Sequence, residues 1–240
     1  MTTKLQISIV LPAHNEAENL PILVSDITNC LNNLGWEYEI IIVNDGSTDN
    51  TKNIVLELKN KNNHIKEVDH QNNRGYGGAV RSGFSAATKE WVFFTDSDRQ
   101  FDIREISKLA EYADTFDLVI GYRKNRQDHF TRKLNAGIFK LAVNILFGLF
   151  VKDIDCAFKL IKKEVIEKVN LESNGALINT ELLVRAKRLG YKIKQIPVSH
   201  YPRLKGEQSG ASIKVVLRAV KEIILFRLTD RTVSELRQKE

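Results

Sequence analysis

The sequence predicts an α/β fold in which a mostly parallel sheet is flanked by helices. The first half of the chain alternates short β-branched apolar segments with longer segments of helical periodicity. The strand-like segment 39–43 is too apolar to face water on either side, which is typical of parallel strands. With 240 residues, of which 42% are hydrophobic, the chain can bury one large core. We therefore expect a single domain over residues 1–240.

The first half is predicted to consist of βαβ units. The expected strands are at 7–11, 39–43, 65–69 and 91–95. The expected helices run over 16–33, from the turn at 45–48 to about 58, and from the glycines at 75–78 to 84. Pro12 is expected to end the first strand, and Asp45-Gly46-Ser47-Thr48 to supply the turn and N-cap of the second helix. Such units form parallel sheets, whose ligands collect beyond the carboxyl ends of the strands.

The second half of the chain, which begins after a further apolar segment at 117–121, is strongly basic. Residues 1–120 carry 11 Lys and Arg against 18 Asp and Glu, whereas residues 121–240 carry 25 against 12. The surplus of +13 predicts an anionic partner for this half, such as nucleic acid, anionic lipid or a phosphorylated substrate. A helix around 180–189 and an edge strand at 192–198 are also expected.

Two apolar segments of the second half are predicted to be amphipathic helices at a membrane interface. The first, 134–151, is about 27 Å long as a helix, slightly short of a bilayer span. Its polar side chains Lys133, Lys140 and Asn144 share one narrow face. With a lysine near its middle, an in-plane helix is favoured over a transmembrane one, and a helix buried between layers is the alternative. The second, 212–228, combines a basic stripe with apolar side chains elsewhere around the helix.

The cysteines and the N-terminus predict a cytoplasmic protein. Cys30 and Cys156 are the only cysteines and lie in very different contexts, so we expect free thiols in a reducing compartment. The first residues lead directly into a strand-like segment, so no signal peptide is expected. Residues 229–240 are expected to form a charged tail.

Polar clusters follow three of the four predicted strands: His14-Asn15-Glu16, Asn44-Asp45 and Asp96-Ser97-Asp98. An aspartate pair spaced i, i+2 can also be a turn or a helix cap, but convergence of three polar clusters at one sheet edge favours a binding site. Asp96, Asp98 and the amide oxygen of Gln100 are hard oxygen ligands of the kind that Mg²⁺ or Mn²⁺ takes while keeping positions for substrate phosphates. We therefore predict a divalent-metal site here.

Other patterns leave alternatives open. The glycine-rich stretch 73–78 has neither Rossmann nor P-loop spacing, so it is either a loop whose backbone approaches a ligand or a tight turn. The five histidines lack metal-ligand spacing, and none is assigned to catalysis. Arg123, Arg132 and Arg203 could be solvated surface residues. Arg203, however, lies in a polar, glycine-bearing stretch at 200–210, and arginine is well suited to bind phosphate.

Together these residues resemble glycosyltransferase family 2, and within it the dolichyl-phosphate mannosyltransferase-like polyprenyl-phosphate enzymes. The resemblance covers about residues 5–225. The matching motifs are P-x-x-N-E at 12–16, V-D-D-G-S-x-D at 43–49, the N-x-G helix start at 73–83, D-x-D-x-Q at 96–100, D-x-x-x-G-F at 153–158, an acidic residue at Glu181 and R-x-x-G-x-S at 203–209. The sequence departs from this pattern at Asn44, where the family has an aspartate, and at Ala157, where it has a glycine.

The resemblance implies a GT-A fold, with residues 1–121 binding a nucleotide sugar and 122–228 facing the acceptor and the membrane. The implied nucleotide-binding residues are Pro12, Ala13, Glu16, Asp45 and Asp96. The implied metal ligands are Asp96, Asp98 and Gln100. The residues implied to contact the acceptor or leaving phosphates are Arg123, Arg132 and Arg203. Asp153 and Glu181 would orient sugar hydroxyls or these arginines, and one of them would be the base if the acceptor were a neutral hydroxyl.

The activity implied by the resemblance is an inverting transfer of a sugar to a lipid phosphate. The expected partners are a donor such as GDP-mannose or a UDP-hexose, a dolichyl or undecaprenyl phosphate, and the cytoplasmic surface of a membrane, with no nucleic acid. A family 2 enzyme that acts on a saccharide or a soluble acceptor is the first alternative. A non-catalytic basic protein that binds membrane or nucleic acid is a remote one, because it leaves the acidic strand ends unexplained.

Overall fold

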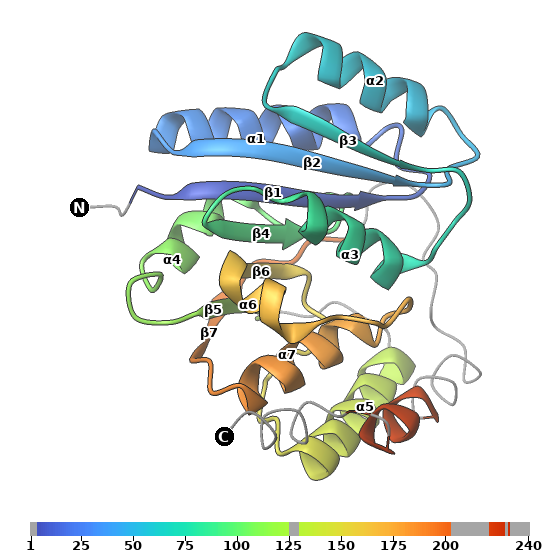
Figure 1. Ribbon diagram of the computed structural model, residues 1–240, viewed down its shortest axis with the longest axis vertical. Helices are drawn as coiled ribbons and strands as arrows, with labels where there is room; N and C mark the ends of the chain where they lie inside the picture. The colour runs from blue at the N-terminus through green and yellow to red at the C-terminus, as the bar shows by residue number, and fades with distance from the viewer. Residues whose placement is uncertain (1–3, 125–129, 203–220, 229, 231–240) are drawn as a thin grey trace.

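The computed structural model describes residues 4–124, 130–202, 221–228 and 230, with the backbone alone at 130–136, 138 and 140. One mixed sheet of seven strands, in the order β3-β2-β1-β4-β6-β5-β7, organises this part of the chain (Figure 1). The strands are β1 Gln6–Ala13, β2 Glu37–Asp45, β3 Ile65–His70, β4 Trp91–Thr95, β5 Leu118–Arg123, β6 Phe158–Lys162 and β7 Ile193–Val198. β6 runs antiparallel to both of its neighbours, and the other paired strands are parallel. The predicted α/β architecture is confirmed.

Helices cover both faces of the sheet. They are α1 Leu20–Leu34, α2 Thr51–Lys61, α3 Tyr76–Ala86, the 3-10 turn η1 Ile103–Glu105, α4 Ile106–Ala110, α5 Phe130–Phe147, α6 Lys163–Val169 and α7 Ile178–Arg188. Residues 221–228 are also helical. The core on one face of the sheet is built with α1, α2 and α4. The core on the other face is built with α3, α5, α6, α7 and the helix at 221–228.

The predicted ends of β1 and α2 were wrong in detail. β1 continues through Pro12 to Ala13. β4 pairs with β1 only as far as Val10, so Pro12 has a neighbouring strand on one side alone and its missing N–H is tolerated. α2 begins at Thr51 rather than directly after Thr48, and the side chain of Asp49 accepts the Thr51 N–H at 2.9 Å.

Ser47 and Thr48 serve a different purpose from the predicted cap. The Asn15 N–H donates to Oγ of Ser47 at 3.0 Å, and the Thr48 N–H donates to Oδ1 of Asn15 at 2.8 Å. These bonds join the loop after β1 to the loop after β2. The polar clusters that follow two neighbouring strands are therefore tied to each other.

α5 begins and ends four residues earlier than the predicted helix at 134–151. One side of it packs in the core through Val143, while Leu141 and Ile145 are 60% and 74% exposed. Phe147 contacts Phe226 at 5.4 Å between ring centroids. α5 therefore packs against the helix at 221–228, which is drawn in red beside it in Figure 1. The helix is thus neither wholly buried nor wholly at a surface. In the described part of the chain, no helix is long and apolar enough to cross a membrane.

Candidate active site at the carboxyl ends of the strands

Asp96 and Asp98 follow β4 in a turn that the preceding strands hold in place. Ser97, between them, is buried and donates its hydroxyl to the carbonyl oxygen of Pro12 at 2.8 Å. The Tyr76 hydroxyl donates to Oδ1 of Asp96 at 2.9 Å. Burial, followed by repulsion from the Asp98 carboxylate, raises the pKa of Asp96 to about 7. A carboxylate pair in which one member resists ionisation is stabilised by a cation.

The donor atoms present fit a metal that is shared with a substrate. In the described ranges, no group of three or more His, Cys, Asp and Glu side chains is arranged to hold a metal ion. Two carboxylates and an amide oxygen leave several positions for phosphate oxygens, as Mg²⁺ and Mn²⁺ sites in nucleotide enzymes commonly do. The residues therefore fit the predicted divalent metal, which would be bound by Asp96, Asp98 and Gln100.

Gln100 links this turn to the segment that follows β7. Its side-chain amide donates to the carbonyl oxygen of Tyr201 at 2.9 Å, and the Tyr201 N–H donates to the Gln100 carbonyl oxygen at 2.8 Å. Phe101 and His200 form an adjacent antiparallel bridge, and their rings are 5.1 Å apart. The side-chain oxygen of Gln100 is the atom that a metal would use, so both roles are compatible. Arg203, two residues after Tyr201, lies outside the described residues.

The predicted nucleoside-binding residues lie at the carboxyl ends of β1 and β2. Ala13 and Asp45 are the last residues of these strands, and both are buried. Oδ1 of Asp45 accepts from Nδ1 of His70 at 2.7 Å and from the Arg74 N–H at 2.8 Å. Glu16 accepts the side-chain amide of Asn19 at 2.6 Å. The structure thus brings these residues together at one edge, and their contact with a nucleoside stays a prediction.

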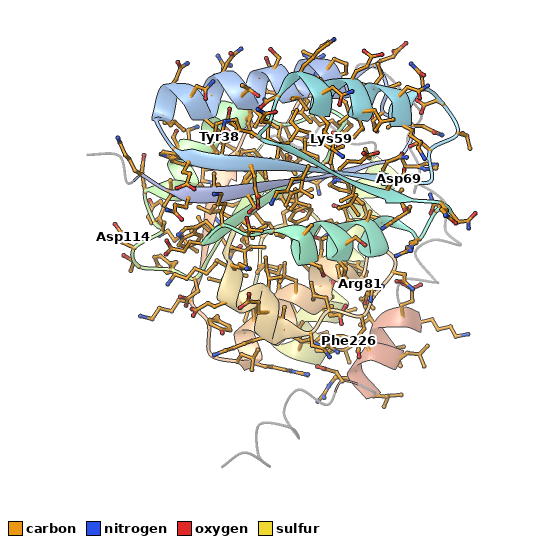
Figure 2. All side chains as sticks on the ribbon, turned by 45° about the horizontal axis from the view of Figure 1, so that its top comes forward. Tyr38, Lys59, Asp69, Arg81, Asp114 and Phe226 are labelled. Carbon is orange, nitrogen blue, oxygen red and sulfur yellow. The ribbon has the colours of Figure 1, made fainter. Side chains whose placement is uncertain are left out.

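The departure at Asn44 has a structural explanation. Its side-chain amide donates to Oδ1 of Asp69 at 2.7 Å. An ionised aspartate at this position would have no hydrogen to donate to Asp69. Asp69 lies at the edge strand β3 (Figure 2), and its other oxygen is 2.7 Å from Nζ of Lys52. These bonds hold the pKa of Asp69 below its ordinary value, with the Lys52 contact the largest cause. An asparagine at 44 therefore joins the carboxyl ends of β2 and β3 without like-charge repulsion.

The glycine-rich loop before α3 is shaped by another part of the chain. The Gly77 N–H donates to the Asn174 carbonyl oxygen at 2.8 Å. A Cβ at Gly77 would lie 2.4 Å from the Ser173 carbonyl oxygen, and one at Gly75 would lie 2.6 Å from that of Asn174. Gly75 also has a φ of 82°, which favours glycine. These glycines are therefore required by close approach of the 173–175 backbone.

Arg123 and Asp153 form a buried ion pair beside the carboxylates. Nε and Nη2 of Arg123 donate to the two carboxylate oxygens of Asp153 at 2.6 and 2.8 Å. The two side chains are 7% and 10% exposed. The guanidinium also lowers the pKa of Asp96, although less than burial raises it. Asp153 thus orients an arginine, which is one of its predicted roles. The side chain of Arg132 lies outside the described residues.

Glu181 on α7 has a different environment from the one expected of a substrate ligand. It is 1% exposed, and its two oxygens accept the N–H groups of Glu172 and Ser173 at 2.9 and 2.8 Å. Nη1 of Arg185 is 2.8 Å from the same carboxylate. Glu181 therefore holds the segment that presses on the glycine loop, and a direct contact with sugar stays a prediction.

Sequence reasoning missed three residues next to Asp96. They are Tyr76 at the start of α3, Lys159 in β6 and Asn179 in α7. Nζ of Lys159 donates to Oδ1 of Asn179 at 2.8 Å. Asn179 also lowers the pKa of the Tyr76 hydroxyl, against a larger rise caused by burial. The lysine had one available signal, because it interrupts the apolar run Phe158-Lys159-Leu160-Ile161. The other two had none, because their proximity depends on how α3 and α7 pack.

Residues 8–169, about two thirds of the chain, match the model of the family described as "Glycosyl transferase family 2". The chain belongs to glycosyltransferase family 2. Among solved structures, this glycosyltransferase is similar to glucosyl-3-phosphoglycerate synthase from Mycobacterium tuberculosis in complex with phosphoglyceric acid, at 20% identity and a TM-score of 0.69 over 94% of this chain and 79% of that one. It is also similar to a mannosyltransferase from Pyrobaculum calidifontis in complex with GDP-Man and Mn²⁺, at 19% identity and a TM-score of 0.60 over 86% and 59%.

A further structure of the Mycobacterium tuberculosis synthase contains Mn²⁺ and uridine-diphosphate-glucose. It is 19% identical, with a TM-score of 0.67 over 95% of this chain and 79% of that one. At such identities the likeness concerns the fold. Within the family, it does not single out the dolichyl-phosphate mannosyltransferase-like branch that the sequence motifs resemble.

Proposed function

We propose that this glycosyltransferase moves a sugar from a nucleoside diphosphate sugar to a polyprenyl phosphate at the cytoplasmic surface of a membrane. One observation supports the choice of donor. Asp45, Asp96 and Asp98 lie at the same edge of the sheet, as does the buried Glu16. Complexes of similar folds with UDP-glucose or GDP-mannose and Mn²⁺ support it. Pro12, Ala13, Glu16 and Asp45 would hold the nucleoside.

Asp96, Asp98 and Gln100 would hold a divalent cation, which when bound neutralises the diphosphate as it leaves. The chain's own residues supply positioning and charge. Arg123, oriented by Asp153, and Arg132 would bind the incoming phosphate, and Arg203 the departing one. The bond between Gln100 and Tyr201 joins the proposed metal site to the end of the described segment after β7.

The acceptor is inferred from the state of the acids. A phosphate monoester is already largely ionised at pH 7, because its second pKa is about 6, and so needs no general base. A hydroxyl acceptor would need one, yet Asp153 is paired with Arg123 and both Glu181 oxygens accept backbone N–H groups. The engagement of both acids with other partners therefore favours attack by a phosphate oxygen.

An exposed apolar surface supports a lipid acceptor. It comprises Leu141 and Ile145 of α5, Phe150, and Ile224, Leu225 and Leu228 of the helix at 221–228, exposed by 48–77%. Basic side chains lie near these residues, since Lys221 and Arg227 are exposed on the same helix and Nζ of Lys187 is 5.7 Å from the Phe150 ring centroid. Apolar side chains framed by cations are suited to an anionic lipid surface.

The second candidate is transfer to a soluble phosphorylated acceptor. It is favoured by the likeness to a synthase crystallised with phosphoglyceric acid. Such an acceptor would occupy the same arginines but leave the apolar surface unused. One of the acids would then have to exchange its present partner for the acceptor hydroxyl.

The deciding experiment is a screen of donors against acceptors. GDP-mannose, UDP-glucose and UDP-N-acetylglucosamine are each offered with undecaprenyl phosphate, dolichyl phosphate or 3-phosphoglycerate. Transfer to a polyprenyl phosphate is expected. Transfer to 3-phosphoglycerate alone would favour the second candidate. Chelation by EDTA should abolish nucleotide-sugar binding, and Mg²⁺ or Mn²⁺ should restore it.

The membrane part of the proposal has its own test. Flotation with anionic vesicles is measured for the wild type and for the double variant Ile145→Ser and Leu225→Ser, which should bind several-fold more weakly. The matched control is Ile22→Ser, because Ile22 is 45% exposed on α1, against the opposite face of the sheet. Equal flotation of all three proteins, or none by the wild type, would contradict membrane binding through this surface.

A further inference from the structure

A hollow beside α3 lies outside the site described so far. Its volume is about 440 Å³, which is within the range of pockets that bind small molecules. The helix contributes residues spaced three or four apart, and the loop before α3 and the edge strand β3 complete the lining. The polar side chains that line it are those of Arg74, Arg81, Ser82 and Ser85. None of these residues is predicted to bind the donor or its metal.

The two arginines give this hollow a positive charge. No acidic residue is among the described residues that line it. In the described ranges, the guanidinium of Arg74 forms no hydrogen bond, and neither Arg74 nor Arg81 pairs with a carboxylate. Two cations that line one hollow without a counter-ion favour the binding of an anion there.

The guanidinium of Arg81 is held in position by neutral oxygens. Nη1 donates to the carbonyl oxygen of Leu171 at 3.4 Å, and Nη2 donates to Oδ1 of Asn174. These bonds join α3 to the segment before α7, and Figure 2 shows Arg81 on that side of α3. Each terminal nitrogen carries a second hydrogen, which is available to a ligand. A guanidinium that is fixed in advance binds an oxyanion at a lower ordering cost.

The hollow is also connected to the proposed donor site. The Ser82 hydroxyl lies 2.9 Å from Nε2 of His70, whose Nδ1 lies 2.7 Å from Oδ1 of Asp45. The Arg74 N–H donates to the same oxygen of Asp45 at 2.8 Å. A ligand bound by Arg74 and Ser82 would therefore contact residues that hold Asp45 in place.

We propose that this hollow is a second anion-binding site, which takes a small soluble molecule that carries a phosphate group. Guanidinium groups bind phosphate oxygens through charge-assisted hydrogen bonds, and the hydroxyls of Ser82 and Ser85 can donate to the remaining oxygens. The volume leaves room for more than one phosphate group. The site goes beyond the proposed transferase activity, because that activity does not use these side chains.

A lipid head group is the other source of a phosphate. The hollow, however, contains none of the exposed apolar residues that are proposed to meet the membrane. Its single large apolar side chain comes from Val68 of β3. The composition of the lining therefore favours a soluble ligand.

The test is a calorimetric titration with inorganic pyrophosphate in EDTA and about 0.15 M NaCl. EDTA removes any metal from the donor site, and the salt screens weak attraction to the basic surface. The wild type should bind. Ser85→Glu, which places a carboxylate in the hollow, should bind at least about tenfold more weakly than Ser85→Gln, which has the same size and no charge. Equal affinity of these two variants would place the anion elsewhere, such as at Arg123, and would overturn the site, as would no binding by the wild type.

An arginine variant tests the positive side of the hollow. Arg74→Gln should weaken pyrophosphate binding about tenfold, the effect of one charge-assisted hydrogen bond. It should retain the melting temperature, because the guanidinium forms no bond to a described residue. Arg104→Gln is the matched control, since Arg104 is an exposed arginine that pairs with Asp102. An equal loss in Arg104→Gln would mean general attraction to the basic surface and would contradict the site.

Flotation distinguishes the two sources of phosphate. Ser85→Glu and Ser85→Gln should float equally well with vesicles that contain phosphatidic acid. Weaker flotation of Ser85→Glu would assign the hollow to a lipid head group and would overturn the soluble ligand. Because these measurements involve neither sugar donor nor acceptor, their outcome is independent of the proposed transferase activity.

Discussion

The two halves of the sheet place their polar residues in different ways. On the side of β1, β2 and β4, polar residues simply follow parallel strands, so register alone brings Asp45 and Asp96 to one edge. On the side of β5 and β6, Arg123 and Lys159 keep their positions through bonds to segments outside their own strands. The first half needs only a local pattern, whereas the second depends on tertiary contacts.

The halves also differ in the apolar side chains that they expose to solvent. Among the described residues, most of the large exposed apolar side chains belong to α5, Phe150 and the helix at 221–228. The half built on β1, β2 and β3 exposes only isolated ones, such as Ile22 and Leu56. This contrast suggests a division between donor binding and acceptor presentation, and the following experiments test it in order of expected effect.

Asp98→Ala should have the largest effect, because it removes a carboxylate from the proposed metal site. Transferase activity should fall by about 10²–10³-fold, and Mn²⁺-dependent nucleotide binding should be lost. Calorimetry and an initial-rate assay measure the two. Asp102→Asn is a nearby control, because its carboxylate pairs with Arg104 at the surface. Unchanged nucleotide binding in Asp98→Ala would show that Asp98 takes no part in binding the nucleotide sugar.

Asp153→Ala should be the most destabilising change among these variants. It leaves the Arg123 guanidinium, 7% exposed, without its bidentate partner, and breaking such a buried pair costs about 3–5 kcal/mol of unfolding free energy. Urea denaturation measures the loss. The surface pair of Lys52 and Asp69 is the matched case in the other half, where Lys52→Ala should leave the urea midpoint close to that of the wild type. Equal losses of stability in the two variants would show that the two halves do not differ in this respect.

The metal-free protein should lose stability as the pH rises from about 4 to about 7. The pKa of Asp96 is raised to about 7, chiefly by burial, so the folded state holds a proton that the unfolded state has released. Stability therefore falls with pH across this window, by about 2–4 kcal/mol. Denaturation in EDTA at several pH values measures the decline, and Asp96→Asn should flatten it. A decline of the same size in Asp96→Asn would assign it to other groups.

Gln100→Glu should have the smallest effect and the most specific one. It keeps an oxygen for a cation but removes the N–H that binds the Tyr201 carbonyl oxygen. The KM for the acceptor should rise about 5–10-fold, as expected for one hydrogen bond, while nucleotide affinity stays within about twofold. Gln100→Ala should impair both. An unchanged acceptor KM in Gln100→Glu would show that the hydrogen bond between Gln100 and Tyr201 does not contribute to acceptor binding.

The local sequence pattern was sufficient to predict the strands of the first half and the position of the two aspartates after β4. It missed β6, because Lys159 breaks an apolar run that otherwise has the composition of a strand. It could not decide the role of the glycines at 75–78, because the backbone that requires them, at 173–175, lies about a hundred residues away in the sequence. The acid at 181 matched a family motif, yet its observed bonds are to backbone N–H groups.

The sequence by itself determined the parallel core and the acidic edge, because strand periodicity and the residues that follow a strand are properties of neighbouring positions. Only the tertiary structure decided how the edge is supported. Arg123 meets Asp153 across 30 residues, and Tyr76 meets Asp96 across 20. Such pairings depend on which helix packs on which face of the sheet. The physical reason is that a buried charge or hydroxyl takes its partner from whatever folding brings within hydrogen-bond distance, and sequence spacing does not record that distance.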